Sequence, residues 1–495
     1  MKSEVSFGSK ILTFIKTKPI LFALIVTGTV AVIVVAIAVP IALSKKDEES
    51  KIMNNEIPYD YNLPKFYDVV DIPNQKLIDF NDINTSADSK FTSINSKSQE
   101  TGITYDSFCT YLGGLELTNE KEKVYLTYKW VTDNIAYDYE NLIGDKRNIV
   151  YNPDQVFERK KTVCSGYAWL FTALLKCMGY EESKIKNIQG HSKGMGYDPE
   201  ANIDDSDTDH EWNAVQIGGQ WCLIDSTWGA GYINSGSFQK SYTDFYLCTP
   251  AEQFVRSHLP VQREKNLQFI DNPIDLNTFL NLAPTNDNFF EYGFLGVSKD
   301  EAVQNICGRG RIVLKYDEIK SPRISYHLEI DNEKIDEYIT SKKYGNNYYY
   351  IDFIINEEGE YVIKLYGQVD PSADTLYSIL SFIIKCDSSP NEKFSFPHFT
   401  GNYKDNIELI YPMQKNLESG KKYNFKILAP EHDELYLYMK ASSETGSNYE
   451  EILMDKKGDY FIKNNVEIYQ GFLSIDYKDS SGNLKNLVQY NIISE

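Results

Sequence analysis

A chain of 495 residues with a net charge of −21 is too long for one hydrophobic core. It is also too acidic to have nucleic acid as its main partner, since phosphate binding needs a cationic surface. Hydrophobic residues make up 42% of the chain and aromatic residues 14%, which excludes global disorder, and 37 Tyr with 25 Phe favour β-rich structure. We therefore expect two to four folded domains and no nucleic-acid partner.

The first predicted element is a transmembrane helix at residues 20–43. This stretch carries no charge, and about 20 helical residues are enough to cross the hydrocarbon core. A cleaved signal peptide is the alternative, because Ala36-Ile37-Ala38 resembles a cleavage site, but the apolar stretch exceeds the usual ~7–15 residues. The excess of Lys in residues 1–19 predicts a short cytosolic tail. We expect a single-pass membrane protein whose C-terminal part is lumenal or extracellular.

A polar stretch and then a helical domain follow the membrane segment. Residues 44–104 are rich in Ser, Asn and Asp and predict a stalk or linker. The first folded domain is expected at residues 105–265. Within it, residues 121–131 carry apolar side chains at helical spacing. A second helix is predicted to begin at Cys164 and to end before Gly179, a residue that helices favour just after their last turn.

A β-hairpin is predicted after the second helix. Side chains alternate from His210 onward, Gly218-Gly219 is typical of a two-residue turn, and residues 220–225 form the return strand. With this turn, position 210 pairs near position 226 or 227. Asp225 is then close enough to hold an N–H of the His210 imidazole.

Three residues of this domain suit nucleophilic catalysis by a thiol. Such chemistry needs a thiolate, a base that generates it, and a group that orients the base. Cys164 begins a helix, whose partial positive charge stabilises a thiolate, and Ser165 and Gly166 leave room for an acyl group. Each residue alone is more often structural, but the hairpin that joins His210 to Asp225 predicts that Cys164, His210 and Asp225 form a catalytic site.

The seven cysteines leave an even number once one nucleophile is removed. Their spacings match no zinc motif such as C-x₂-C. Cys307 and Cys386 could form a disulfide within one β domain. Buried free thiols are the alternative, because such groups pack as small apolar side chains.

Other polar and aromatic residues near the predicted site have two interpretations each. Trp212 and Trp228 are either core residues or walls of a substrate cleft. Residues 204–209 are an acidic insert in which calcium binding is possible, but the Gly and Glu of an EF-hand loop are lacking, which favours a solvated loop. Gln155 could supply an oxyanion donor, although a surface position fits it better. We therefore predict no metal ion and no cofactor.

Short β runs with Gly, Asn and Asp turns fill the rest of the chain. Residues 348–364 and 450–463 resemble each other, since both read as a strand, a charged turn with Gly, an aromatic residue and a second strand. This duplication predicts two β-sandwich modules, at residues 267–388 and 392–495.

Four ordered motifs resemble the transglutaminase-like domain of the kyphoscoliosis peptidase and hillarin group: VCSGYA at 163–168, GHSKGMGY at 190–197, HEWNAV at 210–215 and LIDSTWGAG at 223–231. Residues 246–250 and His258-Leu259-Pro260 resemble the segment that closes that domain, so the likeness covers about residues 105–265. The resemblance implies an α+β papain-like core with Cys164 as nucleophile, His210 as general base and Asp225 as orienting acid. Two departures are Glu211, where the family often has Ala, and the acidic insert before His210.

The leading functional hypothesis is a membrane-anchored thiol enzyme that acts on protein amides. Its thiolate would attack a carboxamide and form a thioester, which an amine resolves by transamidation or water by hydrolysis. The alternative is a catalytically silent surface or lumenal scaffold or adhesion protein that uses the same fold to bind protein partners. An intact trio of catalytic residues favours the enzyme.

Overall fold

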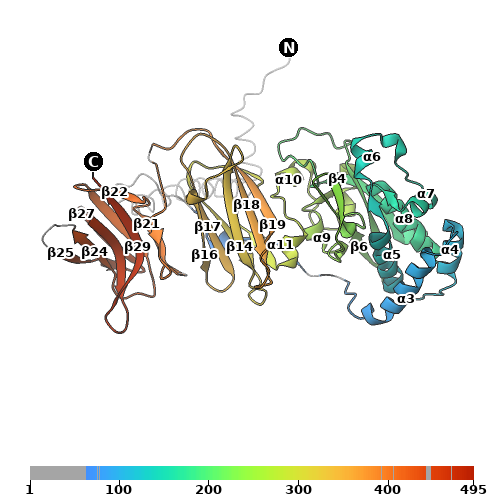
Figure 1. Ribbon diagram of the computed structural model, residues 1–495, viewed down its shortest axis with the longest axis horizontal. Coiled ribbons are helices and arrows are strands. Elements are labelled where there is room, and N and C mark those ends of the chain that lie inside the picture. The colour runs from blue at the N-terminus through green and yellow to red at the C-terminus, as the bar shows by residue number, and fades with distance from the viewer. Residues whose placement is uncertain are drawn as a thin grey trace, which may run out of the picture. The chain divides into compact units, whose positions relative to one another are not determined.

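The computed structural model describes residues 63–494, except 75, 77, 392, 405, 442–447 and 470. The predicted cytosolic tail and transmembrane helix lie outside these residues. Among the helices that the structure describes, none is both long and apolar enough to cross a membrane. The described chain contains a domain of helices with one five-stranded sheet and two two-stranded sheets, β2-β3 (Ala136–Tyr137 and Lys161–Thr162) and β7-β8 (Gly231–Asn234 and Ser237–Lys240), and continues into β-rich modules (Figure 1).

Helices of the first domain pack against a five-stranded antiparallel sheet of order β10-β4-β5-β6-β9. The helices are α3 (Asn84–Ser98), α4 (Tyr105–Gly113), α5 (Glu120–Asn134), α6 (Tyr139–Ile143), α7 (Pro153–Arg159), α8 (Cys164–Cys177) and α9 (Ala251–Phe254). The sheet strands are β4 (Ile185–Ser192), β5 (His210–Ile217), β6 (Gln220–Ile224), β9 (Leu247–Thr249) and β10 (His258–Pro260). Helix α8 contacts both α5 and β5, so the helix that carries the predicted nucleophile is held from two sides.

Local sequence signals explain where the two predicted helices begin and end. The Asn119 side chain accepts hydrogen bonds from the first N–H groups of α5, as an N-cap residue does. Gly179 adopts a φ of +71° just after α8, and its N–H returns to the carbonyl of Lys176 while that of Tyr180 returns to Leu175. This pair of bonds is the Schellman motif that closes helices. Both predicted helices are confirmed.

The predicted hairpin is also confirmed, and its register places the site. Gly218 and Gly219 have φ angles of +57° and +87°, the conformation that a tight two-residue hairpin turn requires. The pairs between β5 and β6 include Asn213 with Ile224, and the same register sets position 210 opposite position 227. His210 therefore begins β5 close to Asp225, which follows the end of β6 directly.

The prediction that residues 44–104 form a stalk is wrong for the part that the structure describes. Residues 84–98 form α3, whose Ile94 is fully buried and whose Ser98 hydroxyl accepts a hydrogen bond from Trp130 Nε1 of α5. Residues 70–71 form β1, which pairs with β11 (Phe294–Val297) of the next module. The polar composition led to the stalk prediction because α3 buries only one narrow face, so most of its side chains are polar.

Two successive modules of packed β-sheets follow, in the predicted order. The first module has two sheets, of order β1-β11-β13-β17-β16 and β12-β19-β18-β14-β15. The second module also has two sheets, one of order β20-β29-β28-β24-β25, in which β22 also pairs with β29, and one of order β21-β23-β27-β26. Their strands are β12 (Val303–Asn305), β13 (Gly308–Tyr316), β14 (Arg323–Ile330), β15 (Glu333–Lys334), β16 (Ile339–Tyr344), β17 (Tyr348–Ile355), β18 (Gly359–Gln368), β19 (Tyr377–Cys386), β20 (His398–Phe399), β21 (Glu408–Tyr411), β22 (Asn416–Glu418), β23 (Lys422–Leu428), β24 (Tyr436–Ala441), β25 (Asn448–Leu453), β26 (Asp455–Lys457), β27 (Tyr460–Glu467), β28 (Gly471–Lys478) and β29 (Leu484–Ile493).

The repeated sequence pattern has a different structural role in each module. In the first module β17 and β18 belong to opposite sheets, and Gly359, with a positive φ, begins β18 just after the chain has crossed. In the second module the chain changes sheet between β25 and β26, and Gly458, also with a positive φ, lies in the turn between β26 and β27 of one sheet. The likeness of the two segments is therefore one of local strand and turn pattern.

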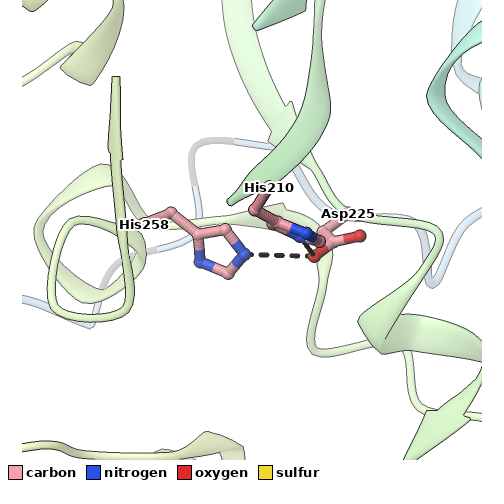
Figure 2. A group of neighbouring side chains, drawn as sticks. All are labelled: His210, Asp225 and His258. Atoms are coloured by element: carbon pink, nitrogen blue, oxygen red, sulfur yellow. Dashed lines mark hydrogen bonds and ion pairs between the residues drawn. The ribbon is translucent and has the colours of Figure 1, made fainter. Parts of the chain in front are cut away.

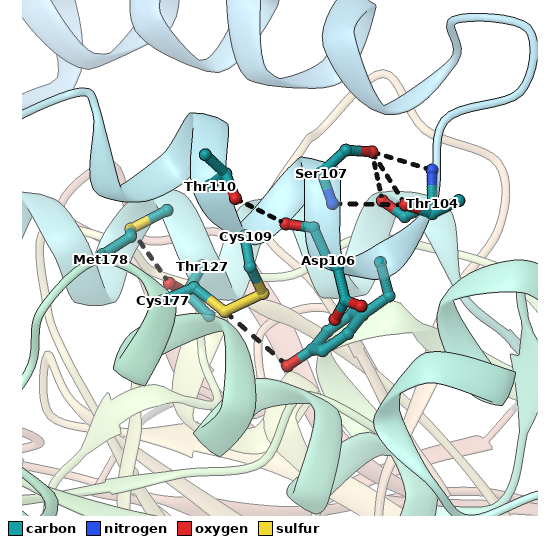
Figure 3. The surroundings of a disulfide bond; sticks show 9 residues. Thr104, Asp106, Ser107, Cys109, Thr110, Thr127, Cys177 and Met178 are labelled. Carbon is teal, nitrogen blue, oxygen red and sulfur yellow. Dashed lines mark hydrogen bonds between the residues drawn. A yellow bond between two sulfur atoms is a disulfide. The ribbon is translucent and has the colours of Figure 1, made fainter.

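Three disulfides pair six of the seven cysteines: Cys109–Cys177, Cys222–Cys248 and Cys307–Cys386. Of the two alternatives left open for Cys307 and Cys386, the structure has the disulfide. Figure 3 shows the first bond joining α4 to the last turn of α8. Cys164 is the free cysteine.

Candidate active site

Cys164 is the first residue of α8, and local strand pairing fixes the segment that leads into it. Strand β3 (Lys161–Thr162) precedes it and pairs in parallel with β2 (Ala136–Tyr137). Val163 occupies the N-cap position without a side-chain hydrogen bond to the helix. The N–H groups of a first helical turn have no acceptor within the helix, so this end is open to a negative charge. The Cys164 side chain is 8% exposed, and its Sγ lies 4.0 Å from the carbonyl oxygen of Asp209.

Gly166 has a packing role that differs from the predicted one. A Cβ at this position would lie 1.9 Å from Oγ1 of Thr162, so the Thr162 side chain fills the space that the glycine leaves. The same hydroxyl donates a hydrogen bond to the carbonyl of Val150. Gly166 therefore lets β3 pack closely against α8, and it does not open space for an acyl group.

His210 and Asp225 meet as the hairpin register requires. Nε2 of His210 lies 2.7 Å from Oδ2 of Asp225, and both side chains are buried (Figure 2). The other ring nitrogen, Nδ1, is then the one left for the Cys164 thiol. Cys164 is near enough to His210 to raise the pKa of its imidazole.

The surroundings of His210 favour its protonated form. Burial alone lowers the pKa of this imidazole, but the Asp225 carboxylate and the Cys164 thiol outweigh burial and raise it well above 6.5. An imidazolium beside a sulfur is one half of a thiolate–imidazolium pair. The site can therefore hold a positive charge on His210 beside the sulfur.

Asp225 is fully buried and accepts four hydrogen bonds. Its Oδ1 accepts from the backbone N–H groups of Thr227 at 2.7 Å and Trp228 at 3.2 Å. Its Oδ2 accepts from His210 and, at 3.0 Å, from Nε2 of His258. Burial raises the pKa of this carboxyl, but the two histidines more than reverse the effect and lower it below its ordinary value. Asp225 is therefore an anion held at both oxygens.

His258 belongs to the same cluster, although it was not predicted as a site residue. It is the first residue of β10, which pairs with β4, and its side chain is fully buried. Figure 2 shows its imidazole and that of His210 converging on one oxygen of Asp225. In the sequence, His258-Leu259-Pro260 resembles only the segment that closes the domain. No spacing rule links it to Asp225, since the contact depends on the order of the strands.

The arrangement of these three side chains is that of a hydrogen-bonded group. Among the described residues, His210, Asp225 and His258 are the set of potential metal ligands that converge, with ligand atoms within 4.8 Å of one another. Their N···O separations of 2.7 and 3.0 Å are hydrogen-bond lengths, shorter than the roughly 3.3 Å that a tetrahedral zinc ion with bonds of about 2.0–2.1 Å would set between two of its ligand atoms. Protons on the two ring nitrogens account for the proximity.

The acidic insert binds backbone N–H groups. Both carboxylate oxygens of Asp205 accept from the single N–H of Gln262, and Asp207 accepts from the N–H of Asp204. Asp209 accepts from the N–H of Ser192 at 2.8 Å. These bonds tie the segment before His210 to β4 and to the chain after β10, which fixes the start of β5.

The predicted aromatic residues occupy different environments. Trp212 is 1% exposed and packs against His258 and Phe254, so it lies in the core. Trp228 is half-buried, with its ring centroid 5.6 Å from that of His210. Trp228 can therefore face a substrate, whereas Trp212 packs in the core against His258. Gln155 is exposed on α7.

Comparisons with known families agree with this domain order. Residues 112–226 match the family model of the transglutaminase-like superfamily. Residues 276–397 match that of the KY-like, immunoglobulin-like domain. The first match contains the candidate nucleophile, base and orienting acid, and the second covers the first β module.

Curated proteins of similar sequence point to the same group. Kyphoscoliosis peptidase of Mus musculus is 25% identical over 275 residues, 55% of this chain and 39% of that protein. Hillarin of Drosophila melanogaster is 28% identical over 218 residues, 40% of this chain and 25% of that protein. Lim and transglutaminase domain protein ltd-1 of Caenorhabditis elegans is 26% identical over 186 residues, 33% of this chain and 23% of that protein. The match thus spans well under half the length of these relatives. Residues 112–226 are therefore a domain of the transglutaminase-like superfamily, and the chain that carries it is similar to the group of kyphoscoliosis peptidase and hillarin.

Proposed function

We propose that this protein is a thiol enzyme that transfers or hydrolyses acyl groups of protein amides, with Cys164 as nucleophile, His210 as general base and Asp225 as orienting acid. The observation that carries the proposal is the buried His210–Asp225 hydrogen bond of 2.7 Å beside a free thiol at a helix start. A protein that used this fold for binding alone would have no need of an ionised carboxylate, a base and a free thiol in the same domain core.

The first chemical step is transfer of the thiol proton to Nδ1 of His210. Asp225 accepts a hydrogen bond from the N–H at Nε2 of His210, which leaves the lone pair on Nδ1 to face the sulfur. The imidazolium that forms lies between two negative charges, the thiolate and the carboxylate. Base assistance of this kind contributes about 10²–10⁴-fold to a rate.

Acyl transfer then follows at the start of α8. The thiolate attacks the carbonyl carbon of a carboxamide, and its C–N bond breaks as the His210 imidazolium gives its proton to the leaving nitrogen. A thioester to Cys164 and a free amine or ammonia result. The unfilled N–H groups of the first helical turn are placed to stabilise the oxyanion, since Val163 contributes no capping side chain.

The thioester can be resolved in two ways from the same site. A primary amine gives a crosslink by transamidation, and water gives deamidation or peptide hydrolysis. Every step uses side chains and backbone groups of this chain, so the proposal includes no metal ion and no cofactor. Protein amides are the proposed substrates because the half-buried Trp228 offers a ring to flank an extended peptide.

The N-terminal segment completes the proposal. Residues 20–43 are proposed to anchor the protein in a membrane, with the chain after them on the lumenal or extracellular side. Three disulfides support an oxidising compartment, where such bonds form and persist. Carbonate extraction of membranes from cells that express the full chain tests the anchor. Release of the protein into the soluble fraction contradicts it.

The deciding experiment compares the full chain with its Cys164→Ala variant. Each is given a glutamine-containing peptide with a labelled amine and, separately, a quenched-fluorescence peptide library. Incorporation of the amine above the variant's background identifies a transamidase, and cleavage identifies a peptidase. Equal signals from both proteins contradict the enzyme and favour a scaffold or adhesion protein.

A further inference from the structure

A second histidine shares the orienting carboxylate, and the proposed mechanism does not use it. His258 is 33 positions beyond Asp225 in the chain, yet its Nε2 lies 3.0 Å from the same Oδ2 that His210 binds. The His258 side chain is 0% exposed. An imidazole in such a place needs a defined proton arrangement, because a buried polar atom without a partner is costly.

The proton arrangement of His258 follows from its two neighbours. An ionised carboxylate only accepts hydrogen bonds, so Nε2 of His258 carries the proton that faces Asp225. Nδ1 of a neutral imidazole is then an acceptor, and the Ser257 hydroxyl lies 2.8 Å from it and can donate. The Ser257 hydroxyl is therefore placed to support the tautomer that serves Asp225.

Packing around His258 holds it neutral and fixes its plane. Its ring stacks on Phe254 with centroids 4.0 Å apart and lies 4.5 Å from the Trp228 ring. Burial lowers the pKa of His258 to about 4, against the pull of Asp225. A neutral ring next to the His210 imidazolium avoids placing two cations with ring centroids 5.3 Å apart.

His258 is in no position to act as the base itself. Ser257 occupies its Nδ1 and Asp225 its Nε2. The charged and titratable groups that act on it are Asp225 and His210, with the Tyr246 ring packed nearby, whereas Cys164 acts on His210. Its influence on the thiol must therefore pass through the carboxylate.

We propose that His258 is a positioning residue of the thiol site: it donates the Nε2 proton to Oδ2 of Asp225, holds that oxygen in place and limits the pull of the carboxylate on His210. This inference rests on the proposed thiol chemistry. Without the His258 donor, the carboxylate becomes a stronger acceptor for His210 alone. The His210 imidazolium then persists to higher pH.

The test is the pH dependence of Cys164 alkylation by iodoacetate in the full chain. The His210 imidazolium attracts this anionic reagent and so speeds its reaction with Cys164. The fall of the alkylation rate at high pH, the alkaline limb, therefore reports the loss of the His210 proton. His258→Met removes the donor at similar volume, and His258→Gln keeps an N–H that can reach Asp225. We expect the limb to move up by about half a pH unit or more in His258→Met and to stay in place in His258→Gln.

Separate outcomes address the two levels of the argument. If wild-type alkylation at acid pH is no faster than in His210→Ala, the proposed function fails. If that difference is present but the limb is the same in wild type and folded His258→Met, or shifts equally in His258→Gln, the role of His258 is overturned while the proposed function stands.

One measurement on the unmodified protein decides the matter even if His258→Met does not fold. Histidine-selective ¹⁵N labelling and NMR report the tautomer and charge of each of the six histidines. We expect His258 to be neutral, with its proton on Nε2, from pH 8 to pH 5. A charged ring in this range, or a proton on Nδ1, overturns the inference.

Discussion

Replacing Asp225 by Asn reverses the hydrogen-bond logic of the site with little change in shape. The amide oxygen can still accept from the N–H groups of Thr227 and Trp228, which leaves the NH₂ group at the place of Oδ2. This NH₂ faces two ring nitrogens, those of His210 and His258, at 2.7 and 3.0 Å. Both rings must then carry their protons on Nδ1, so Nδ1 of His210 becomes a donor and cannot accept the proton of Cys164.

The size of the effect follows from the bonds that change. Two hydrogen bonds to a buried charge are lost, each worth about 1.5–3 kcal/mol, and two weaker neutral bonds replace them, so we expect a net loss of roughly 2–3 kcal/mol of stability. An unassisted thiol is only ~0.03% ionised at pH 5. A stabilised thiolate is a weaker nucleophile, which offsets part of that difference, so alkylation by iodoacetamide at pH 5 should slow by roughly 10- to 100-fold.

The assay is the pseudo-first-order rate of Cys164 modification, followed by mass spectrometry, with a denaturation curve for each variant. Asp207→Asn is the matched control, since it makes the same charge change on the exposed insert close to the site. It should react at the wild-type rate. A folded Asp225→Asn protein that also keeps the wild-type rate at pH 5 refutes the role assigned to the carboxylate.

Three further changes test the structure around the site. His258 has a pKa of about 4 in the folded protein and about 6.5 in the unfolded chain, so between these values the unfolded chain binds an extra proton and the folded state loses stability as the pH falls. His258→Gln should remove up to roughly 3 kcal/mol of this pH dependence, measured as the difference between denaturation curves at pH 7 and pH 4.5. Gly190→Ala places a Cβ 2.6 Å from the Trp212 ring. It should lower the free energy of unfolding by about 1–3 kcal/mol and slow the alkylation of Cys164. Wild-type behaviour in both assays would show that β4 has room to move. Replacing both Cys222 and Cys248, which close a 26-residue separation between β6 and β9, by Ala should cost about 3.5 kcal/mol, and an unchanged melting curve would contradict a bond between them.

The sequence alone predicted those parts of the site that depend on local structure. Cys164 at a helix start follows from helical periodicity ended by Gly179, and the approach of His210 to Asp225 follows from a two-residue turn at Gly218-Gly219. Each of these inferences needs contacts within one or two adjacent elements. Such short-range signals are the most dependable ones in a single sequence.

The missed features depend on long-range packing. His258 reaches Asp225 because β10 pairs with β4, which lies next to β5, and no local pattern encodes that strand order. Helix α3 was missed because its polar sequence buries little besides Ile94. Gly166 was assigned to substrate access, although its neighbour Thr162 fills that space from a different element. In each case the missing information is which distant segment supplies the partner.

Trapping of an acyl-enzyme tests the central claim most directly. The full chain is mixed with a library of glutamine-containing peptides, quenched in acid, digested without reductant, and the peptide that contains Cys164 is weighed. Acyl transfer by the thiol predicts a peptide-sized mass increase on Cys164 that hydroxylamine removes and that His210→Ala lacks. A Cys164 that reacts with iodoacetamide under the same conditions yet never carries an acyl group contradicts the claim.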